Sequence, residues 1–303
     1  MKSVAILIPC YNEEHTIADV VKSFREILPE ARIYVYDNDS EDNTGEIANS
    51  VGAEVIKVKD RGKGNVVRRM FTDIDADTYI MIDGDSTYDV EDAPKILQKM
   101  ETEKADMVVA VRKPMDPERA YPCGHQSGNR FFNFILKMLF NSTFHDIFSG
   151  YRGFTRRFVK TFPVASTGFD IEAELSIHAL TLGVPFAEIE SKYSERPLNS
   201  CSKLSTVKDG IKILWSIMRL LRENRPLLFF GMIALFLFIL SFFWGIPIIQ
   251  TFLKSGQVPR LPTAVLSAST MIMSSISLIC GLLLDSTSQF RMEVKKLHFL
   301  GFK

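Results

Sequence analysis

The feature that most limits how this chain can fold is residues 227–249, a run of 23 residues without a charge. As a helix this run would rise about 34 Å, enough to cross the hydrocarbon core of a bilayer. Residues 262–284 form a second uncharged run, whose serines and threonines suit helix–helix contact in lipid. The two runs predict a pair of transmembrane helices joined by a loop at residues 251–261, with Pro247 kinking or ending the first.

Basic residues flank these runs. Residues 207–225 predict an amphipathic helix lying in the membrane interface; the alternative is an ordinary core-packed helix. Its basic side carries Lys208, Lys212, Arg219 and Arg222. The tail after residue 285 is also basic, which places it and the preceding soluble part in the cytosol by the positive-inside tendency. Lys254 and Arg260 in the loop weaken that asymmetry.

The soluble part alternates strand-like and helix-like segments. This order predicts an α/β domain with a mostly parallel sheet covered on both faces, and ligands bind such sheets at the carboxyl ends of the strands. The predicted strands are residues 4–8, 32–36, 54–58, 78–82 and 107–111. The predicted helices are residues 16–28, 44–51, 64–74, 90–103, 129–140 and 169–182. Residues 4–9 are too short an apolar run for a signal peptide, and Phe158 and Phe162 are expected in the core.

Polar residues collect where four of these strands end, at residues 9–14, 37–44, 60–65 and 83–85. Each group alone could be a loop with a helix cap. Four groups at one edge of one sheet predict a binding pocket. Its contents suit a nucleotide, with acids for base and ribose hydroxyls and Lys63 between two glycines for phosphate.

Asp83-Gly84-Asp85 follows the apolar strand at residues 78–82 directly. Neighbouring strand residues point to opposite faces, but Gly84 can break the alternation because glycine adopts backbone angles closed to other residues. Both carboxylates could then converge on one hard cation, Mg2+ or Mn2+. The alternative is a strand that ends in an Asp-Gly turn.

Charge and cysteine content give no indication of a nucleic-acid-binding, zinc-binding or disulfide-rich protein. Lys+Arg and Asp+Glu both total 36, so net charge gives no indication of nucleic-acid binding. The four cysteines are far apart without a CxxC spacing, which favours neither zinc nor a disulfide framework.

Two residues outside these groups, Asp146 and Arg152, have two possible interpretations each. Asp146 could contact a bound sugar or a phosphate-binding arginine, or it could cap a turn at Ser149. Arg152 could bind phosphate, or it could pair with an acid at residues 170–174.

At this point the motifs resemble those of a known family. Residues 8–14 (IPCYNEE), the Asp37…Ser40-x-Asp42-x-Thr44 loop and Asp83-Gly84-Asp85 resemble family 2 glycosyltransferases with the GT-A fold. Residues 146–152 (DIFSGYR) and Arg196…Ser202-Lys203-Leu204 resemble the polyprenyl-phosphate subgroup, relatives of dolichol-phosphate mannose synthase. The two apolar runs are similar to those of the bacterial members.

The resemblance implies roles for individual residues. Asp83 and Asp85 would hold the donor diphosphate through Mg2+ or Mn2+, and the catalytic set would be Asp83, Asp85, Asp146 and Arg196. The nucleotide sugar would meet Pro9, Tyr11, Asn12, Glu13, Asp37, Asp39, Lys63 and Gly84. The acceptor phosphate would meet Arg112, His125, Arg152 and Lys203. Four positions depart from the family pattern: Asn38 replaces an acid, Asp39 a glycine, Asn199 a glycine, and His125 a serine.

The expected architecture is a GT-A, Rossmann-like domain at residues 1–205, an interfacial helix at 206–225, a transmembrane hairpin at 226–285 and a basic cytosolic tail at 286–303. The implied activity is inverting transfer of a hexose from a UDP-sugar to undecaprenyl phosphate at the bacterial inner membrane, and the resemblance suggests a homotetramer. Two alternatives stay open: a tethered synthase that extends a polysaccharide directly, although Gln-x-x-Arg-Trp is missing, and a non-catalytic sugar-nucleotide-binding scaffold.

Overall fold

The computed structural model describes residues 3–114, 137, 144–163, 171–194, 214–215, 218–219 and 221–301. The chain divides into two compact units, one of Met1–Leu214 with Lys296–Lys303 and one of Trp215–Lys295. Most of the predicted helices at residues 129–140 and 207–225 lies outside the described residues. The domain boundaries given above stay predictions.

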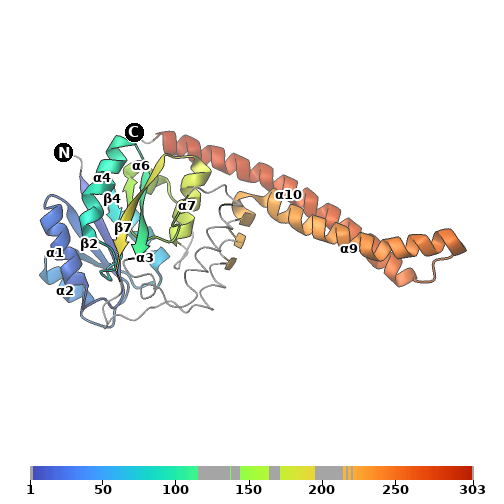
Figure 1. Ribbon diagram of the computed structural model, residues 1–303, viewed down its shortest axis with the longest axis horizontal. Helices are drawn as coiled ribbons and strands as arrows, with labels where there is room; N and C mark the ends of the chain where they lie inside the picture. Colours follow the sequence, from blue (N-terminus) through green and yellow to red (C-terminus); the bar gives the residue numbers. More distant parts are fainter. Residues whose placement is uncertain are drawn as a thin grey trace. The chain divides into compact units, whose positions relative to one another are not determined.

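The first unit is built on one seven-stranded sheet (Figure 1). Its strands are β1 (Val4–Cys10), β2 (Arg32–Asp37), β3 (Glu54–Lys57), β4 (Thr78–Met81), β5 (Met107–Pro114), β6 (Arg152–Thr155) and β7 (Phe186–Tyr193). They lie in the order β3-β2-β1-β4-β6-β5-β7, and β6 runs antiparallel to both of its neighbours while the other pairs are parallel. The predicted mostly parallel sheet is therefore confirmed.

Helices cover both faces of this sheet, and Figure 1 shows α1 and α7 on opposite sides of it. The helices are α1 (Ile17–Ile27), α2 (Thr44–Ser50), α3 (Lys63–Asp73), α4 (Ala93–Thr102) after the 3-10 turn η1 (Val90–Asp92), α6 (Arg156–Thr161) and α7 (Ile171–Leu182). Side chains alternate across the strands, so Ile6 and Ile80 join the core under α1, where Phe24 is buried. On the other face Phe71 of α3 packs edge-on against Phe154, with ring centroids 5.7 Å apart.

Three elements were not predicted from the sequence, namely β6, α6 and β7. The β6 strand has only four residues and begins with a charged one, so its sequence gives no apolar run to recognise. Phe158 and Phe162, expected in the core, are buried, and they belong to the α6 segment and its end.

The second unit consists mainly of two long helices, α9 (Pro226–Ser255) and most of α10 (Leu261–Gly301), drawn side by side in Figure 1. Both are long and apolar enough to cross a membrane. The first runs through Pro247 and ends at Ser255, so the connection is residues 256–260 rather than the longer loop expected. The second continues past residue 284 to Gly301.

Small and hydroxyl residues hold the two helices together. The Oγ of Ser241 donates to the carbonyl of Ser267 at 2.8 Å, and the Oγ of Ser267 donates back to the carbonyl of Ser241 at 2.9 Å. Further along, Ser274 Oγ donates to Ala234 O at 2.7 Å. These contacts explain why the second apolar run is rich in serine, since small polar residues let helices approach closely in lipid.

A glycine pair tests this packing. A Cβ at Gly281 would lie 3.1 Å from Phe230 Cβ, whereas one at Gly231 would meet nothing within 4 Å. We expect Gly281→Leu to lower stability by about 1–3 kcal/mol through overpacking. Gly231→Leu gains the same helix propensity without the clash and serves as the matched control. The thermal unfolding midpoint in detergent is the measurement, and equal midpoints for the two variants would contradict the packing described.

Candidate functional site

The loops after β1, β2 and β4 carry an unusual backbone. Asn12, Asp39 and Ser86 have φ values of 53°, 60° and 59°. Non-glycine residues rarely adopt this left-handed region, and where they do the surrounding structure must hold them there. These three residues follow three parallel strands at one edge of the sheet, and Lys104 is the one other described non-glycine residue with a positive φ. Most of this unusual backbone therefore lies where the sequence predicted the pocket.

Hydrogen bonds join the first two of these loops. The main-chain NH of Asn12 donates to Ser40 Oγ at 3.0 Å, and Asn12 Oδ1 accepts from the NH of Glu41 at 2.8 Å. The NH of the buried Glu13 donates to Thr44 Oγ1 at 2.8 Å. Side chains of the second loop therefore fix the backbone of the first.

Asp37, a predicted nucleotide contact at the end of β2, and its neighbour Asn38 make different contacts. Asp37 is buried and its Oδ1 accepts from the NH of Ser40 at 3.0 Å. Asn38 donates from Nδ2 to Asp60 O at 2.8 Å and accepts at Oδ1 from the NH of Gly62 at 2.7 Å. An acid at position 38 could not make both kinds of bond, because an ionised carboxylate only accepts. The departure from the family pattern therefore has a structural role.

Arg61, which the sequence analysis did not single out, lies at the outer edge of the same loops. It contacts Asp39 Oδ2 at 3.3 Å and Glu41 Oε1 at 2.8 Å, and its guanidinium carbon is 5.3 Å from the ring centroid of Tyr11. Three loops thus meet at one exposed arginine. The acids at positions 39 and 41 and the basic residues at positions 61 and 63 were the only sequence signal that could have suggested this pairing.

The Asp83-Gly84-Asp85 turn is held by close packing. Gly84 does not have a positive φ, so the backbone freedom expected of it is not used; Ser86 adopts the left-handed conformation instead. What requires glycine is space, because a Cβ at position 84 would lie 2.6 Å from Cys10 Sγ. Likewise a Cβ at Gly150 would lie 2.4 Å from Asp83 Oδ2. Both glycines allow neighbouring strands to close around the acid pair.

Each acid of the pair has a defined partner. Asp83 Oδ1 is 2.5 Å from Lys63 Nζ, and the same Nζ is 2.5 Å from Glu172 Oε1. Burial alone would lower the pKa of Lys63, but the two carboxylates raise it, so the ammonium stays charged. Asp85 is buried, and its Oδ1 accepts from Thr87 Oγ1 at 2.6 Å.

This donor set fits a hard divalent cation. Asp83 and Asp85 offer carboxylate oxygens, the ligand type that Mg2+ and Mn2+ prefer. Among the described residues, no group of three or more His, Cys, Asp or Glu side chains forms a closed metal site. A cation held here would therefore take its remaining ligands from a bound phosphate or water, as Mg2+ commonly does at phosphate sites.

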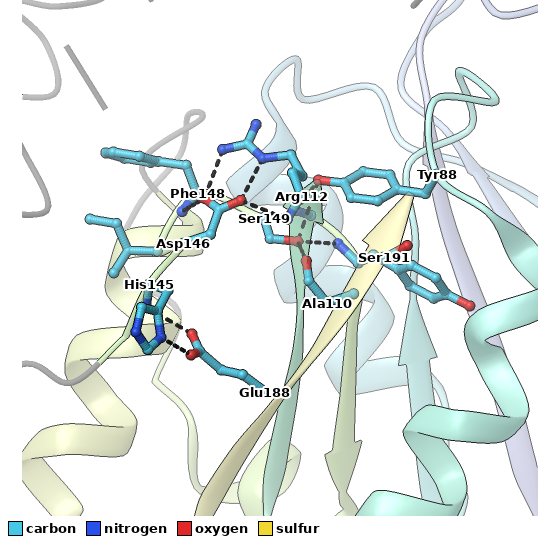
Figure 2. Close-up of polar contacts among 12 residues, drawn as sticks. Tyr88, Ala110, Arg112, His145, Asp146, Phe148, Ser149, Glu188 and Ser191 are labelled. Atoms are coloured by element: carbon cyan, nitrogen blue, oxygen red, sulfur yellow. Dashed lines mark hydrogen bonds and ion pairs between the residues drawn. The ribbon is translucent and has the colours of Figure 1, made fainter. Parts of the chain in front are cut away.

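Arg112, at the end of β5, is held by Asp146 (Figure 2). Arg112 Nε donates to Asp146 Oδ2 at 2.6 Å and Nη2 to Oδ1 at 2.8 Å, a bidentate pair. Burial would raise the pKa of the Asp146 carboxyl, but Arg112 lowers it below its usual range. Asp146 also accepts from the NH of Phe148 at 3.3 Å. Asp146 therefore holds an arginine and also caps a turn, although the NH that it caps is that of Phe148 rather than Ser149.

The burial of Arg152 argues against the predicted contact with the acceptor phosphate. Its side chain is 0% exposed. Nε donates to Ser149 O at 2.8 Å, Nη1 to Ser176 Oγ at 2.9 Å and Nη2 to Ile147 O at 2.6 Å. Burial lowers the pKa of this guanidinium to about 10, which leaves it charged at neutral pH. Arg152 ties the segment before β6 to α7 and has no exposed atom for a ligand.

The Ser149-Gly150-Tyr151 segment lies between the Lys63–Asp83 pair and the Arg112–Asp146 pair. Ser149 Oγ donates to Ala110 O at 2.5 Å, and the NH of Gly150 donates to Tyr88 Oη at 2.9 Å; Figure 2 shows Tyr88 directed at this turn. Gly150 lies against Asp83, and Ser149 bonds to Ala110 of β5, the strand that carries Arg112. The motif therefore sets the spacing between the acid pair and Arg112. Arg196, Lys203 and His125 lie outside the described residues.

The order of strands and the single reversed strand define a GT-A-type fold. Residues 5–162 match the family described as "Glycosyl transferase family 2", and the chain belongs to that family. It is a glycosyltransferase.

Relatives share most of the chain. It is 36% identical over 233 residues to glycosyltransferase AglJ of Haloferax volcanii, covering 77% of this chain and 76% of the relative. It is 30% identical over 223 residues to the dolichyl-phosphate hexose transferase of the same organism, covering 73% and 95%. It is 25% identical over 215 residues to the undecaprenyl-phosphate mannosyltransferase of Micrococcus luteus, covering 67% and 87%.

Among solved structures, glucosyl-3-phosphoglycerate synthase from Mycobacterium tuberculosis, in complex with Mn2+, UDP and glucosyl-3-phosphoglycerate, is similar in fold. The TM-score is 0.58 at 21% identity, covering 73% of this chain and 79% of that one. The likeness supports the fold assignment.

Proposed function

We propose that this protein transfers a hexose from a UDP-sugar to a polyprenyl phosphate, undecaprenyl phosphate in a bacterium, at the cytosolic face of the inner membrane. The observation that carries the proposal is the placement of two ion groups at one edge of the sheet: Asp83 and Asp85 with Lys63, and Arg112 held by Asp146. One group suits a sugar diphosphate and the other a second anion. The relatives named for dolichyl-phosphate and undecaprenyl-phosphate transfer support a lipid phosphate as that second anion.

The reaction would be a single displacement. An acceptor phosphate oxygen forms the new bond to the anomeric carbon as the bond to the diphosphate breaks, and the electron pair of the broken bond leaves with UDP. The anomeric centre is inverted. The acceptor oxygen is already anionic, so a strong protein base is not needed. Arg112 would bind the acceptor phosphate, since the planar guanidinium of arginine suits phosphate geometry.

The donor would lie along the loops after β1, β2 and β4. Asp37 would meet the uracil or ribose, and Lys63 the diphosphate. The residues that would hold Mg2+ or Mn2+ are Asp83 and Asp85, and the relative in fold with Mn2+ and UDP supports a divalent cation without distinguishing the two metals. A bound cation would neutralise charge that develops on the leaving diphosphate.

The membrane helices would keep the site near the headgroup layer, so that only the phosphate of the lipid leaves the bilayer. The α9 and α10 hairpin supports this placement by its length and composition. The basic residues that precede α9 and follow residue 290 support a cytosolic catalytic unit.

The deciding experiment is a panel of UDP-sugars incubated with the purified full chain, a divalent cation and undecaprenyl phosphate, with products identified by mass. A lipid monophosphate sugar is the expected product, and the reactive donor identifies the sugar. A polymer would favour the polysaccharide synthase instead. No product with any sugar would favour the non-catalytic scaffold.

Arg112→Lys tests the acceptor assignment. Lysine keeps the charge beside Asp146 but loses the planar fork, so one charge-assisted hydrogen bond of about 1.5–3 kcal/mol is lost. We expect KM for undecaprenyl phosphate to rise about ten- to a hundredfold, with KM for the UDP-sugar unchanged.

Lys113→Met is the matched control, because the exposed Lys113 pairs only across the surface with Glu190 at 2.6 Å. A rise in the donor KM of Arg112→Lys, with the lipid KM unchanged, would assign Arg112 to the donor instead.

A further inference from the structure

Glu172 has no role in the proposal above, yet it shares Lys63 with Asp83. The three residues come from three separate elements: the start of α3, the loop after β4 and the first turn of α7. Lys63 Nζ is 2.5 Å from each carboxylate. One ammonium therefore neutralises part of the charge of two acids, at the edge where the donor diphosphate would bind.

The two acids differ in their exposure to solvent. The Glu172 side chain is 5% exposed and that of Lys63 is 10%, whereas that of Asp83 is 28%. A buried carboxylate without a partner costs several kcal/mol, so Glu172 depends on its cation. Asp83 reaches solvent and can exchange one cation for another at lower cost. The electrostatic field of Glu172 also supports the charge of the buried Arg152, which adds a second reason for Glu172 to stay fixed.

We propose that Glu172 is a positioning residue and that Lys63 is an exchangeable counter-ion of Asp83. Without donor, Lys63 lies between the two acids. When a divalent cation binds at Asp83, the like charges of cation and ammonium repel, and Lys63 stays on Glu172 with its Nζ free to bind a donor phosphate oxygen. This inference rests on the proposed function, because it takes Asp83 as a cation ligand.

The exchange predicts opposite effects for two substitutions. In Lys63→Met the competitor for Asp83 is gone, so we expect Mn2+ without nucleotide to bind about tenfold more tightly, while UDP with Mn2+ binds more weakly. In Glu172→Gln the ammonium keeps only Asp83, so we expect Mn2+ alone to bind about tenfold more weakly. If Lys63 and Glu172 only stabilised the fold, both substitutions would weaken Mn2+ binding or leave it unchanged.

The experiment measures free Mn2+ by electron paramagnetic resonance during titration of the detergent-purified full chain, and then UDP binding by calorimetry at saturating Mn2+. Lys99→Met is the control, since Lys99 forms an exposed pair with Glu103. The double variant Lys63→Met/Glu172→Gln removes the acid that Lys63→Met would leave buried and unpaired. The double variant should bind Mn2+ more tightly than wild type, and it keeps the test available if either single variant fails to fold.

Tighter Mn2+ binding in the double variant and in Lys63→Met, with weaker binding in Glu172→Gln, would support the exchange. Equal or weaker Mn2+ binding in the double variant, while wild type and Lys99→Met bind Mn2+ and UDP normally, would overturn it and leave the proposed function standing. If wild type and Lys99→Met bind neither UDP nor Mn2+, the proposed function fails and the exchange fails with it.

Discussion

Sugar transfer by the Asp85→Asn variant should fall about a thousandfold, which corresponds to about 4 kcal/mol of transition-state stabilisation. The expectation follows from the position of Asp85 beside Asp83 at the end of β4, where it would supply a charged oxygen to the cation. Asparagine is chosen because its Oδ1 can still accept from Thr87, as Asp85 does at 2.6 Å, so the turn is preserved while the charge is removed.

The measurement is the initial rate with radiolabelled UDP-sugar and undecaprenyl phosphate, together with the thermal midpoint of the variant. Asp75→Asn is the matched control, because Asp75 lies before β4, at the other end of that strand from the acid turn, and forms an exposed ion pair with Arg156. A rate for Asp85→Asn close to that of Asp75→Asn would refute the cation role of Asp85.

The second large effect is on stability. We expect Arg152→Met to lower the free energy of unfolding by about 3–5 kcal/mol, because it leaves buried oxygens of Ser149, Ile147 and Ser176 without the guanidinium that binds them. The thermal midpoint should fall by roughly 10 °C for a chain of this size.

Arg156→Met is the control for this variant. Arg156 lies four residues further along the chain, and its pair with Asp75 is exposed, so its loss should leave the free energy of unfolding nearly unchanged. If Arg152→Met instead kept the wild-type midpoint and raised only the KM for the lipid, the acceptor-phosphate role that the buried position argues against would be restored.

The elements that sequence reasoning found are those with a local signal. The strands at residues 4–8 and 78–82 are apolar runs, and the helix at residues 16–28 has apolar residues at helical spacing. The acids at positions 83 and 85 were found because charge directly after a buried strand is unusual. Each of these patterns is complete within a few residues.

What the sequence missed depends on contacts between distant residues. Lys63 and Glu172 are more than a hundred positions apart, and no sequence pattern around either residue indicates that they form an ion pair. The role of Arg152 depends on β6 lying between β4 and β5, which no local pattern encodes. The importance of Gly84 was recognised, but its reason was packing against Cys10, and a packing distance cannot be read from a motif.

The reciprocal hydrogen bonds between Ser241 and Ser267 affect how the two helices insert into the membrane. Each hydroxyl finds its acceptor on the opposite helix, and the turn between the helices spans only residues 256–260. If either helix entered the hydrocarbon core of the bilayer alone, its serine hydroxyl would lack the carbonyl acceptor that the other helix provides. We therefore expect the pair to leave the insertion machinery together, so that a fault in one helix would be seen first as lost protein in the membrane and only later as lost turnover.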